Sequence, residues 1–328
     1  MHSPAVLIVT HGDDDHAPLV SAELDKLGTQ VVLFDTDDYP GSNDLTFGVD
    51  AGLSAVRFRV DGREYRGDTF DAILYRHLRL PIAPYIVDAE ARRMAEWELR
   101  WTLEGALLAL EPALWMNHPH ANTLSRSKLL QLRLASRLGF TVPDTRVTAD
   151  PEEIRRQYQV WEGRMIAKLA GGQIVGGHIA SQYVVHTSLI TNDDLQDDGA
   201  LSACPAIYQR LVEKSYDLRV TVVGDEVFAC RIDSQRHKAA RVDWRGMGHA
   251  ELDLHPLDLD ATVADRCRAL LRALGLEIAG IDLVVTPVGE MVFLEINAAG
   301  QWAWVQEATG LPIAAAIAQR LAAARTAP

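Results

Sequence analysis

The sequence predicts an α/β (α+β) protein with more than one packed unit, and three observations support this. The chain opens with an apolar run at 5–10, a helical pattern over about 17–27 that ends at Gly28, and a second apolar run at 31–34, which together predict a β-α-β unit. Strand-like segments dominate the second half of the chain. With 328 residues, the protein is also long enough for two or three packed units.

The remaining elements follow from periodicity and from the residues that break it. A helical pattern over about 88–110 ends before Pro112, which cannot continue it, and a loop at 117–120 that holds His118 and His120 precedes a helix over about 125–138. Further helices are expected near 261–274 and 312–324. The strand-like runs are 165–169, 182–185, 206–211, 219–223, 227–232, 281–286 and 291–296. Linkers near residues 112 and 190 predict three domains, 1–112, 113–190 and 191–328.

Composition and charge exclude several classes of protein. The 45 acidic and 32 basic residues give a net charge of −13, whereas a general nucleic-acid binder needs a basic surface. The three cysteines are far apart and have no metal-type spacing, so we expect a reduced, cytoplasmic protein. The N-terminal residues do not resemble a signal peptide, and no segment is apolar enough to span a bilayer. We therefore expect neither a nucleic-acid partner nor a membrane.

The strongest local signal is a pair of β-rich runs, 280–286 and 291–297, around a Pro/Gly turn. With a four-residue turn, Thr286 pairs with Met291, and the same register places Asp282 opposite Glu295. Opposed carboxylates repel each other unless a cation lies between them, and Asn297 points to the same face as Glu295. Two carboxylates and an amide oxygen suit Mg²⁺. A solvated acidic hairpin is the alternative, although the neighbouring residues are mostly apolar.

A lysine beside a glycine-rich segment is the second signal. Lys168 ends a strand-like run and precedes the glycines of 171–177, where backbone N–H groups can approach phosphate oxygens. No Gly-Lys-Ser/Thr follows, so this is not a Walker loop, and a plain hairpin turn is the alternative. Lys128 lies in the predicted 125–138 helix, where most lysines face solvent. The strand end at 208–213 can offer backbone groups to a purine edge.

Taken in order, these segments resemble an ATP-grasp enzyme over nearly the whole chain. The resemblance implies an ATP-grasp fold behind an N-terminal pre-ATP-grasp α/β domain, with ATP and Mg²⁺ as cofactors. Lys128 and Lys168 match the two lysines that contact the nucleotide. The positions that match the adenine hinge and the acidic nucleotide contact behind it are Gln209, Arg210, Leu211, Val212 and Asp217. The magnesium triad corresponds to Asp282, Glu295 and Asn297.

Within this superfamily the chain is most similar to the maturases of microviridin-type peptides (graspetides). The segments that carry the narrower match are 35–40, 75–76, 115–117, 227–235, 243–245 and 297–302. Those enzymes join Asp or Glu side chains of a precursor to Ser/Thr hydroxyls or a Lys amine. The chain departs from their pattern at His77 and at Ala298-Ala299. The resemblance implies a ribosomal precursor peptide, with leader and core, as the partner, and it is compatible with a homodimer.

The chemistry that the resemblance implies is activation of a carboxylate as an acyl phosphate. Cations that stabilise the transferred phosphoryl group supply most of the catalysis in such reactions. Arg231 and Arg245 are the arginines expected beside the metal hairpin, and Arg219 is a further basic candidate. For Arg245, a surface ion pair with Asp243 is the alternative.

An acidic run, 13–15, followed by His16 invites a metal-site interpretation, but we expect it to cap the helix that begins near Ala17.

Three functional hypotheses remain open on the sequence. The first is a ligase that macrocyclises a ribosomal peptide through its own side chains. The second is an ATP-grasp ligase that adds amino acids to a peptide or protein tail. The third is a nucleotide-binding regulator without turnover, which the intact Asp282, Glu295 and Asn297 set speaks against.

Overall fold

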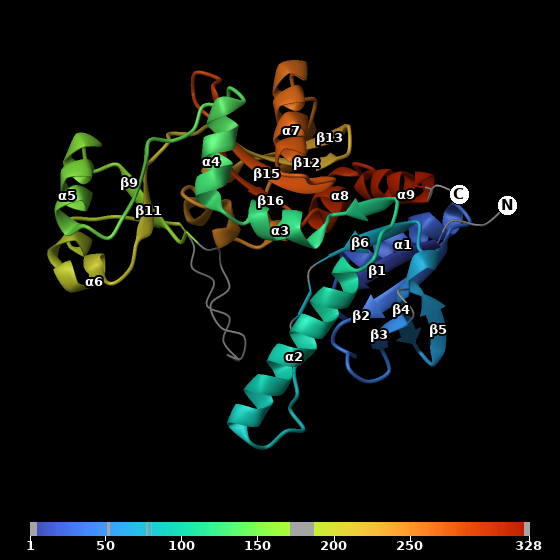
Figure 1. Ribbon diagram of the computed structural model, residues 1–328. Helices are drawn as coiled ribbons and strands as arrows, with labels where there is room; N and C mark the ends of the chain where they lie inside the picture. The colour runs from blue at the N-terminus through green and yellow to red at the C-terminus, as the bar shows by residue number, and fades with distance from the viewer. Residues whose placement is uncertain (1–4, 51–52, 77, 80, 171–186, 325–328) are drawn as a thin grey trace.

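The computed structural model describes residues 5–50, 53–76, 78–79, 81–170 and 187–324. Three sheets carry the helices of the main body, and a fourth, small sheet lies beside the first (Figure 1). The predicted strand at 182–185 and the glycine-rich segment 171–177 fall outside the described residues. No helix in the described ranges is both long and apolar enough to cross a membrane.

The N-terminal sheet is parallel, with the order β2-β1-β6-β7. Its strands are β1 (Ala5–Thr10), β2 (Gln30–Asp35), β6 (Ala72–Tyr75) and β7 (Leu114–Met116). Helix α1 (His16–Lys26) follows β1, so the predicted β-α-β opening is confirmed. Helix α9 (Ile313–Ala323), from the far end of the chain, packs with α1 against one face of this sheet, which joins the two ends of the chain in one core.

A long helix and a small sheet cover the other face of the N-terminal sheet. Helix α2 (Ala89–Leu108) agrees with the predicted 88–110 helix. The small antiparallel sheet consists of β3 (Asp44–Asp50), β4 (Leu53–Val60) and β5 (Arg63–Arg66), none of which the sequence analysis predicted. Phe58 in β4 is fully buried against Phe34 and Phe70, so this sheet extends the N-terminal core.

The central sheet is antiparallel, with the order β10-β9-β11-β8. Its strands are β8 (Thr145–Thr148), β9 (Met165–Lys168), β10 (Ser188–Leu189) and β11 (Ala206–Arg210). Helices α5 (Pro151–Val160) and α6 (Asp198–Ser202) pack on one face, around Tyr158 and Trp161.

The C-terminal sheet is antiparallel, with the order β14-β13-β12-β15-β16. Its strands are β12 (Tyr216–Val223), β13 (Glu226–Ile232), β14 (Leu254–Leu257), β15 (Ile278–Val285) and β16 (Met291–Asn297). Helices α4 (Lys128–Arg137) and α7 (Ala261–Ala273) share its hydrophobic core. Two short α-helices are α3 (Pro119–Ser125) and α8 (Ala303–Thr309), and a 3-10 turn at Trp244–Gly246 carries Arg245.

Two predictions about the starts of helices differ from the structure. His120 lies inside α3, and the His118 ring accepts a hydrogen bond from the His120 N–H, so the loop predicted for both residues is shorter than expected. Helix α1 begins at His16 with Asp15 as N-cap, but the Asp15 side chain forms no capping hydrogen bond. The acidic run instead contacts the first turn through Asp14, whose Oδ1 accepts a hydrogen bond from the His16 N–H over 3.2 Å.

The chain crosses between sheets near both predicted domain boundaries. Strand β7 lies beyond residue 112 yet pairs with β6, and β11 lies beyond residue 190 yet pairs with β9. The division of the chain into the domains 1–112, 113–190 and 191–328 therefore stays a prediction.

Candidate active site

The site is built around the hairpin of β15 and β16, where Asp282 lies opposite Glu295 as predicted. The register near the turn differs from the prediction by one residue, because Met291 pairs with Val285 and not with Thr286. An irregularity next to Asp282 leaves Leu294 as the extra residue of a β-bulge, and this restores the predicted pairing further along the strands.

Three side chains hold Glu295. Arg245 Nη1 lies 2.9 Å from Oε1, Lys128 Nζ lies 3.1 Å from Oε2, and the Asn297 amide donates to Oε1 over 3.3 Å. Burial opposes ionisation of this carboxyl, but Arg245, Lys128 and the nearby Lys168 outweigh it and lower its pKa below the usual range. Glu295 is therefore ionised at neutral pH.

Asp282 has a different environment. The Arg219 Nη1 donates to Oδ1 over 2.9 Å, and both side chains are buried. Burial raises the pKa of Asp282 above its usual value, and although Arg219 opposes this, the charge on Glu295 adds to it. The pKa of Asp282 is thus raised and the pKa of Glu295 is lowered, although the two carboxylates face each other.

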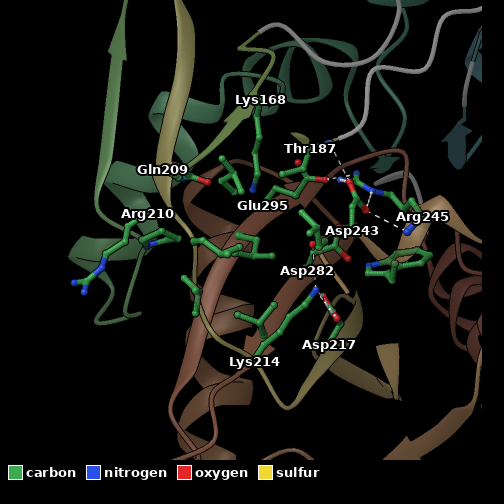
Figure 2. Close-up of a pocket in the computed structure, with 18 residues that line it drawn as sticks. Lys168, Thr187, Gln209, Arg210, Lys214, Asp217, Asp243, Arg245, Asp282 and Glu295 are labelled. Atoms are coloured by element: carbon green, nitrogen blue, oxygen red, sulfur yellow. Dashed lines mark hydrogen bonds and ion pairs between the residues drawn. The ribbon is translucent and has the colours of Figure 1, made fainter. Parts of the chain in front are cut away.

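Lys168 extends from β9 toward Glu295, as Figure 2 shows. Burial lowers the pKa of its ammonium to about 8, against the attraction of Glu295 and with the repulsion of Lys128. Of the two predicted lysines, Lys128 therefore contacts Glu295 directly, and the charge of Lys168 lies close enough to act on it.

Arg245 is fixed by a two-point contact with Asp243. Its Nε and Nη2 donate to the two Asp243 oxygens over 2.8 and 2.9 Å, while Nη1 reaches Glu295. Burial opposes the charge on Asp243, but Arg245 lowers the pKa of Asp243 to about 2. The Asp243 ion pair that formed the alternative interpretation is present, but it is largely buried and orients Arg245 toward the carboxylate pair.

The predicted adenine hinge lines the same pocket. Gln209, Leu211 and Val212 lie along its wall with Ile166 and Lys168. Gln209 is 2% exposed, its Nε2 donates to the Thr145 hydroxyl over 3.0 Å, and its Oε1 has no partner among the described residues. A buried acceptor without a donor suits a ligand that brings an N–H group.

Arg210 and Asp217 lie at the edges of this arrangement. The Arg210 backbone lines the pocket, but its guanidinium points away (Figure 2) and lies 4.0 Å from Asp144 at the surface. Asp217 also lines the pocket, where it contacts Lys214 Nζ at 2.7 Å and accepts from the Ser234 hydroxyl. Burial raises the pKa of Asp217 despite Lys214.

Arg231 is the predicted residue that the structure does not bring into this cluster. It pairs with Leu218 across β12 and β13, so it points to the opposite face of the sheet from Arg219, which pairs with Asp282. There its guanidinium lies 4.2 Å from the centre of the Tyr216 ring, and Nε donates to Asp233 over 2.6 Å.

Several supporting residues were not predicted. Gln131 in α4 donates to the Ile296 carbonyl over 2.8 Å and accepts from the Ile296 N–H over 3.1 Å, which fixes Lys128 above β16. Asn117 donates to the Ile278 and Ala298 carbonyls and so ties its segment to the hairpin. Gln131 carries no sequence signal for such a role, whereas Asn117 belongs to the 115–117 segment of the family resemblance.

A buried polar network joins the N-terminal sheet to the segment after β16. Arg76 contacts both oxygens of Asp14, at 3.2 and 3.3 Å, and donates to the Ala299 carbonyl over 2.8 Å. The His16 Nε2 accepts from the Trp302 N–H over 3.1 Å, so the ring proton is on Nδ1, which lies 3.0 Å from Asp14. Asp14 is therefore the centre of a contact between distant parts of the chain.

The donor set at the hairpin fits a magnesium ion better than a transition metal. No group of three or more His, Cys, Asp or Glu side chains in the described ranges could hold a metal by itself. Mg²⁺ is commonly held by one or two carboxylates and takes its other ligands from phosphate and water. Asp282 and Glu295, with the Asn297 amide, can supply the protein ligands of such an ion. The cationic side chains beside them suit phosphate.

Two family models cover the chain. The model described as "MvdD pre-ATP grasp domain" matches residues 5–123, and the model described as "RimK-like ATP-grasp domain" matches residues 125–321.

Two solved structures are similar over almost their whole length. A RiPP-associated ATP-grasp ligase from Chryseobacterium gregarium, in complex with ADP and a leader and core peptide, is 30% identical, with 97% of this chain and 96% of that chain covered and a TM-score of 0.89. The macrocyclase MdnC from Microcystis aeruginosa, bound with precursor peptide MdnA, is 28% identical, with 97% and 99% covered and a TM-score of 0.84.

Curated relatives match a smaller part. A probable alpha-L-glutamate ligase 2 from Shewanella amazonensis is 29% identical over 198 residues, which is 60% of this chain and 62% of that protein. Across the similar ligases, the chain spans 47% to 66% of the length of the curated relatives it matches.

Proposed function

The chain belongs to the RimK-like ATP-grasp family, and we propose that it cross-links a ribosomally made precursor peptide through the peptide's own side chains. In this proposal it activates Asp or Glu carboxylates of the peptide and forms ester or amide rings. The observation that carries it is the similarity, at 30% identity over 97% of the chain, to a ligase solved with a leader and core peptide.

The pocket between the central and C-terminal sheets is the proposed nucleotide site. Gln209, with its unpartnered buried oxygen, and the 211–212 backbone would hold the adenine edge. Lys168 and Lys128 would contact phosphates, and Asp282, Glu295 and Asn297 would hold Mg²⁺. When bound, Mg-ATP supplies the phosphoryl group that turns a carboxylate into an acyl phosphate.

The arginines have distinct proposed roles. Arg245 is held by Asp243 and is therefore oriented before any ligand arrives, which suits stabilisation of a transferred phosphoryl group. Arg219 does not line the pocket itself but contacts Asp282 over 2.9 Å, so its proposed role is to position that carboxylate. Arg231 would contribute only from the other face of the sheet.

The reaction balances without a redox partner. A carboxylate oxygen of the peptide attacks the γ-phosphorus, and ADP leaves. A hydroxyl or amine of the same peptide then attacks the acyl carbon, phosphate leaves, and the acceptor loses its proton. Each ring therefore removes one water from the peptide.

The second candidate is addition of amino acids to a peptide or protein tail. The similarity to probable alpha-L-glutamate ligases favours it, but that similarity covers 60% of the chain. The macrocyclase similarity includes that domain.

Mass spectrometry separates the two candidates. Purified protein is incubated with ATP, Mg²⁺ and candidate precursors, which are short acidic, Ser/Thr-containing peptides sought among the reading frames beside its gene, and no amino acid is added. The expected result is a loss of one water per ring, with ADP released in step. Removal of the leader should slow the reaction sharply, because tethering raises the effective concentration of the core.

The tail-ligase candidate predicts a different change in peptide mass. If the peptide mass stays constant until a free amino acid is supplied, and then rises by that residue, the chain is a tail ligase. Release of no ADP with either substrate would support the third hypothesis, a regulator without turnover.

A further inference from the structure

Three aromatic rings from separate segments pack together beside the pocket. Trp244, His249 and Trp304, here called the aromatic cluster, come from the 3-10 turn Trp244–Gly246, the 3-10 turn His249–Glu251 and helix α8. The His249 imidazole stacks on the Trp304 indole, with the ring centres 4.4 Å apart and the planes at 13°. The Trp244 ring lies 5.7 Å from His249 and 5.1 Å from Trp304, and Trp244 itself lines the pocket.

The aromatic cluster lies at the end of the pocket where phosphoryl transfer is proposed. Figure 2 shows Gln209, from the proposed adenine hinge, and Arg245 at opposite ends of the pocket. Trp244 directly precedes Arg245 in the chain. An acyl phosphate formed beside Arg245 would therefore have the aromatic cluster as its neighbour.

A single backbone carbonyl links the cluster to the carboxylate pair. The Gln301 carbonyl accepts a hydrogen bond from Arg219 Nη2 over 3.1 Å and another from Trp304 Nε1 over 3.1 Å. Arg219 also donates to Asp282 over 2.9 Å. The indole on which His249 stacks is thus held by the same contacts that hold Arg219 and Asp282.

The ring closure that follows activation needs a group that accepts a proton, and His249 is available for this. Among the described residues, none forms a hydrogen bond or an ion pair with the His249 imidazole, and the residue is exposed. The carboxylates that line the described pocket are not available in this way, because each already contacts a Lys or Arg side chain: Asp217, Asp243, Asp282 and Glu295.

The surroundings of His249 keep its ring neutral at pH 7. Partial burial against the indoles lowers the pKa of His249 below its ordinary value of 6.5, and the positive charge of Arg219 adds to this. The elements that pack against the ring also carry Arg245 and Glu307, and its own turn carries Glu251, but none of these causes the shift. A neutral imidazole has a free lone pair for a proton.

We propose that His249 accepts the proton of the hydroxyl or amine that attacks the acyl phosphate. The proposal rests on the proposed function and concerns its second step. The attacking oxygen or nitrogen bonds to the acyl carbon, and the bond from that carbon to the phosphate oxygen breaks with its electron pair. The proton of the attacking group moves to the imidazole, phosphate leaves, and the imidazolium then returns its proton to water.

A single-turnover experiment separates this step from activation. The full-length enzyme, in excess over a precursor peptide that loses water with wild type, is mixed with ATP and Mg²⁺ and quenched with hydroxylamine. Hydroxylamine converts an acyl phosphate to a hydroxamate, and mass spectrometry counts hydroxamates and rings. His249→Phe keeps the stack on Trp304 but has no proton acceptor. Acyl phosphate should form at the wild-type rate and accumulate, while rings appear about 100-fold more slowly.

His120→Phe is the matched control. His120 is exposed in α3 and lies outside the aromatic cluster, so this variant should form rings as wild type does. Rings that form at the wild-type rate in His249→Phe would overturn the proposal, and so would the loss of both hydroxamate and rings. The hydroxamate that wild type forms reports on the proposed function alone, whereas the partition between hydroxamate and rings in the variant reports on His249.

The pH dependence of ring closure distinguishes a base from a residue that only supports the fold. For a hydroxyl acceptor, the wild-type rate of ring closure should stay constant from about pH 7 to about pH 8.5, because His249 is already neutral there. In His249→Phe the rate should rise with pH over that range, because hydroxide has to take the proton. The same flat profile in both proteins would contradict a proton-accepting role.

Discussion

Lys168 places a cation where little water reaches it. Burial lowers the pKa of its ammonium to about 8, from an ordinary value near 10.5. A lysine in this state binds phosphate strongly when protonated, because few waters compete for its charge. Without a ligand, the buried charge destabilises the fold, so such a lysine is rarely found without a partner of opposite charge.

Lys168→Met should therefore act in opposite directions on stability and binding. At neutral pH the charged lysine costs the fold up to about 3 kcal/mol, judged from the pKa shift, and that cost disappears as the pH rises from about 8 to 10.5. We expect a higher melting temperature for the variant without nucleotide, and an affinity for a non-hydrolysable ATP analogue about 10- to 100-fold lower.

The pH dependence of nucleotide binding provides the control for this prediction. For wild type, calorimetry should show weaker analogue binding as the pH rises above about 8, where free Lys168 loses its proton. Lys168→Arg should flatten that dependence, because arginine keeps its proton. Lys128→Met should mainly reduce affinity, since Lys128 contacts Glu295 from the partly exposed side. Unchanged affinity in all three variants would contradict the assignment of these lysines.

The two carboxylates should respond differently to amide substitution. Asp282→Asn and Glu295→Gln should each reduce ADP release with peptide present on the order of 100-fold or more, because each removes a charge that would hold Mg²⁺. Glu295→Gln should also lower the melting temperature more, since it removes the carboxylate that Lys128 contacts and one of the two that Arg245 contacts. Asp282 is already biased toward its neutral form, so its amide disturbs the fold less. Wild-type turnover in either variant would contradict the metal assignment.

At the scale of elements, β15 provides the space that Arg219 occupies. A Cβ added at Gly280 would lie 2.4 Å from Arg219 Nη2 and 2.5 Å from its Cζ. The glycine is therefore needed for close approach of the guanidinium to the strand. Arg219 in turn reaches Asp282 and the Gln301 carbonyl.

Gly280→Ala should displace Arg219 and reduce turnover at least tenfold, while the β15–β16 hairpin remains formed. Steady-state ADP release and the melting temperature, measured together, check this. Gly48→Ala in β3 is the matched control, since an added Cβ there has no neighbour closer than 4.0 Å, and it should leave turnover unchanged. Equal effects of the two substitutions would show that Gly280 acts only through the strand backbone.

At the scale of the whole molecule, Asp14 joins the N-terminal domain to the segment that follows the β15–β16 hairpin. Burial opposes its charge, but His16 and Arg76 outweigh this and hold the pKa of Asp14 well below its usual range. Its contribution to stability is therefore present above pH about 4 and is lost only in strong acid. Burial lowers the pKa of His16, so stability should fall as the pH drops below about 6.5, where the histidine of the unfolded chain gains a proton before the buried one does.

Arg76→Met should leave the Asp14 carboxylate buried without its main cation. We expect a loss of about 3 kcal/mol or more in unfolding free energy and a lower kcat, because the 299–302 backbone loses an anchor. Urea unfolding and steady-state kinetics measure the two effects. Arg66→Met removes an exposed ion pair with Asp68 and should change stability by less than about 1 kcal/mol. A loss of similar size in both variants would argue against a special role for Asp14.

The sequence by itself determined the elements whose patterns are local and the residues whose spacing is regular. The β-α-β opening and helix α2 are of this kind, because periodicity depends on neighbours in the chain. Asp282 faces Glu295 as predicted only because the bulge at Leu294 offsets the one-residue difference in register at the turn. The tertiary structure alone decided which distant charges meet. It brought Lys128, Lys168 and Arg245 to one carboxylate, left Arg231 on the other face of its sheet, and buried Asp14 between distant segments. Such contacts depend on how sheets pack and on which face a strand presents, and a one-residue bulge such as that at Leu294 changes that face without a clear sign in the sequence.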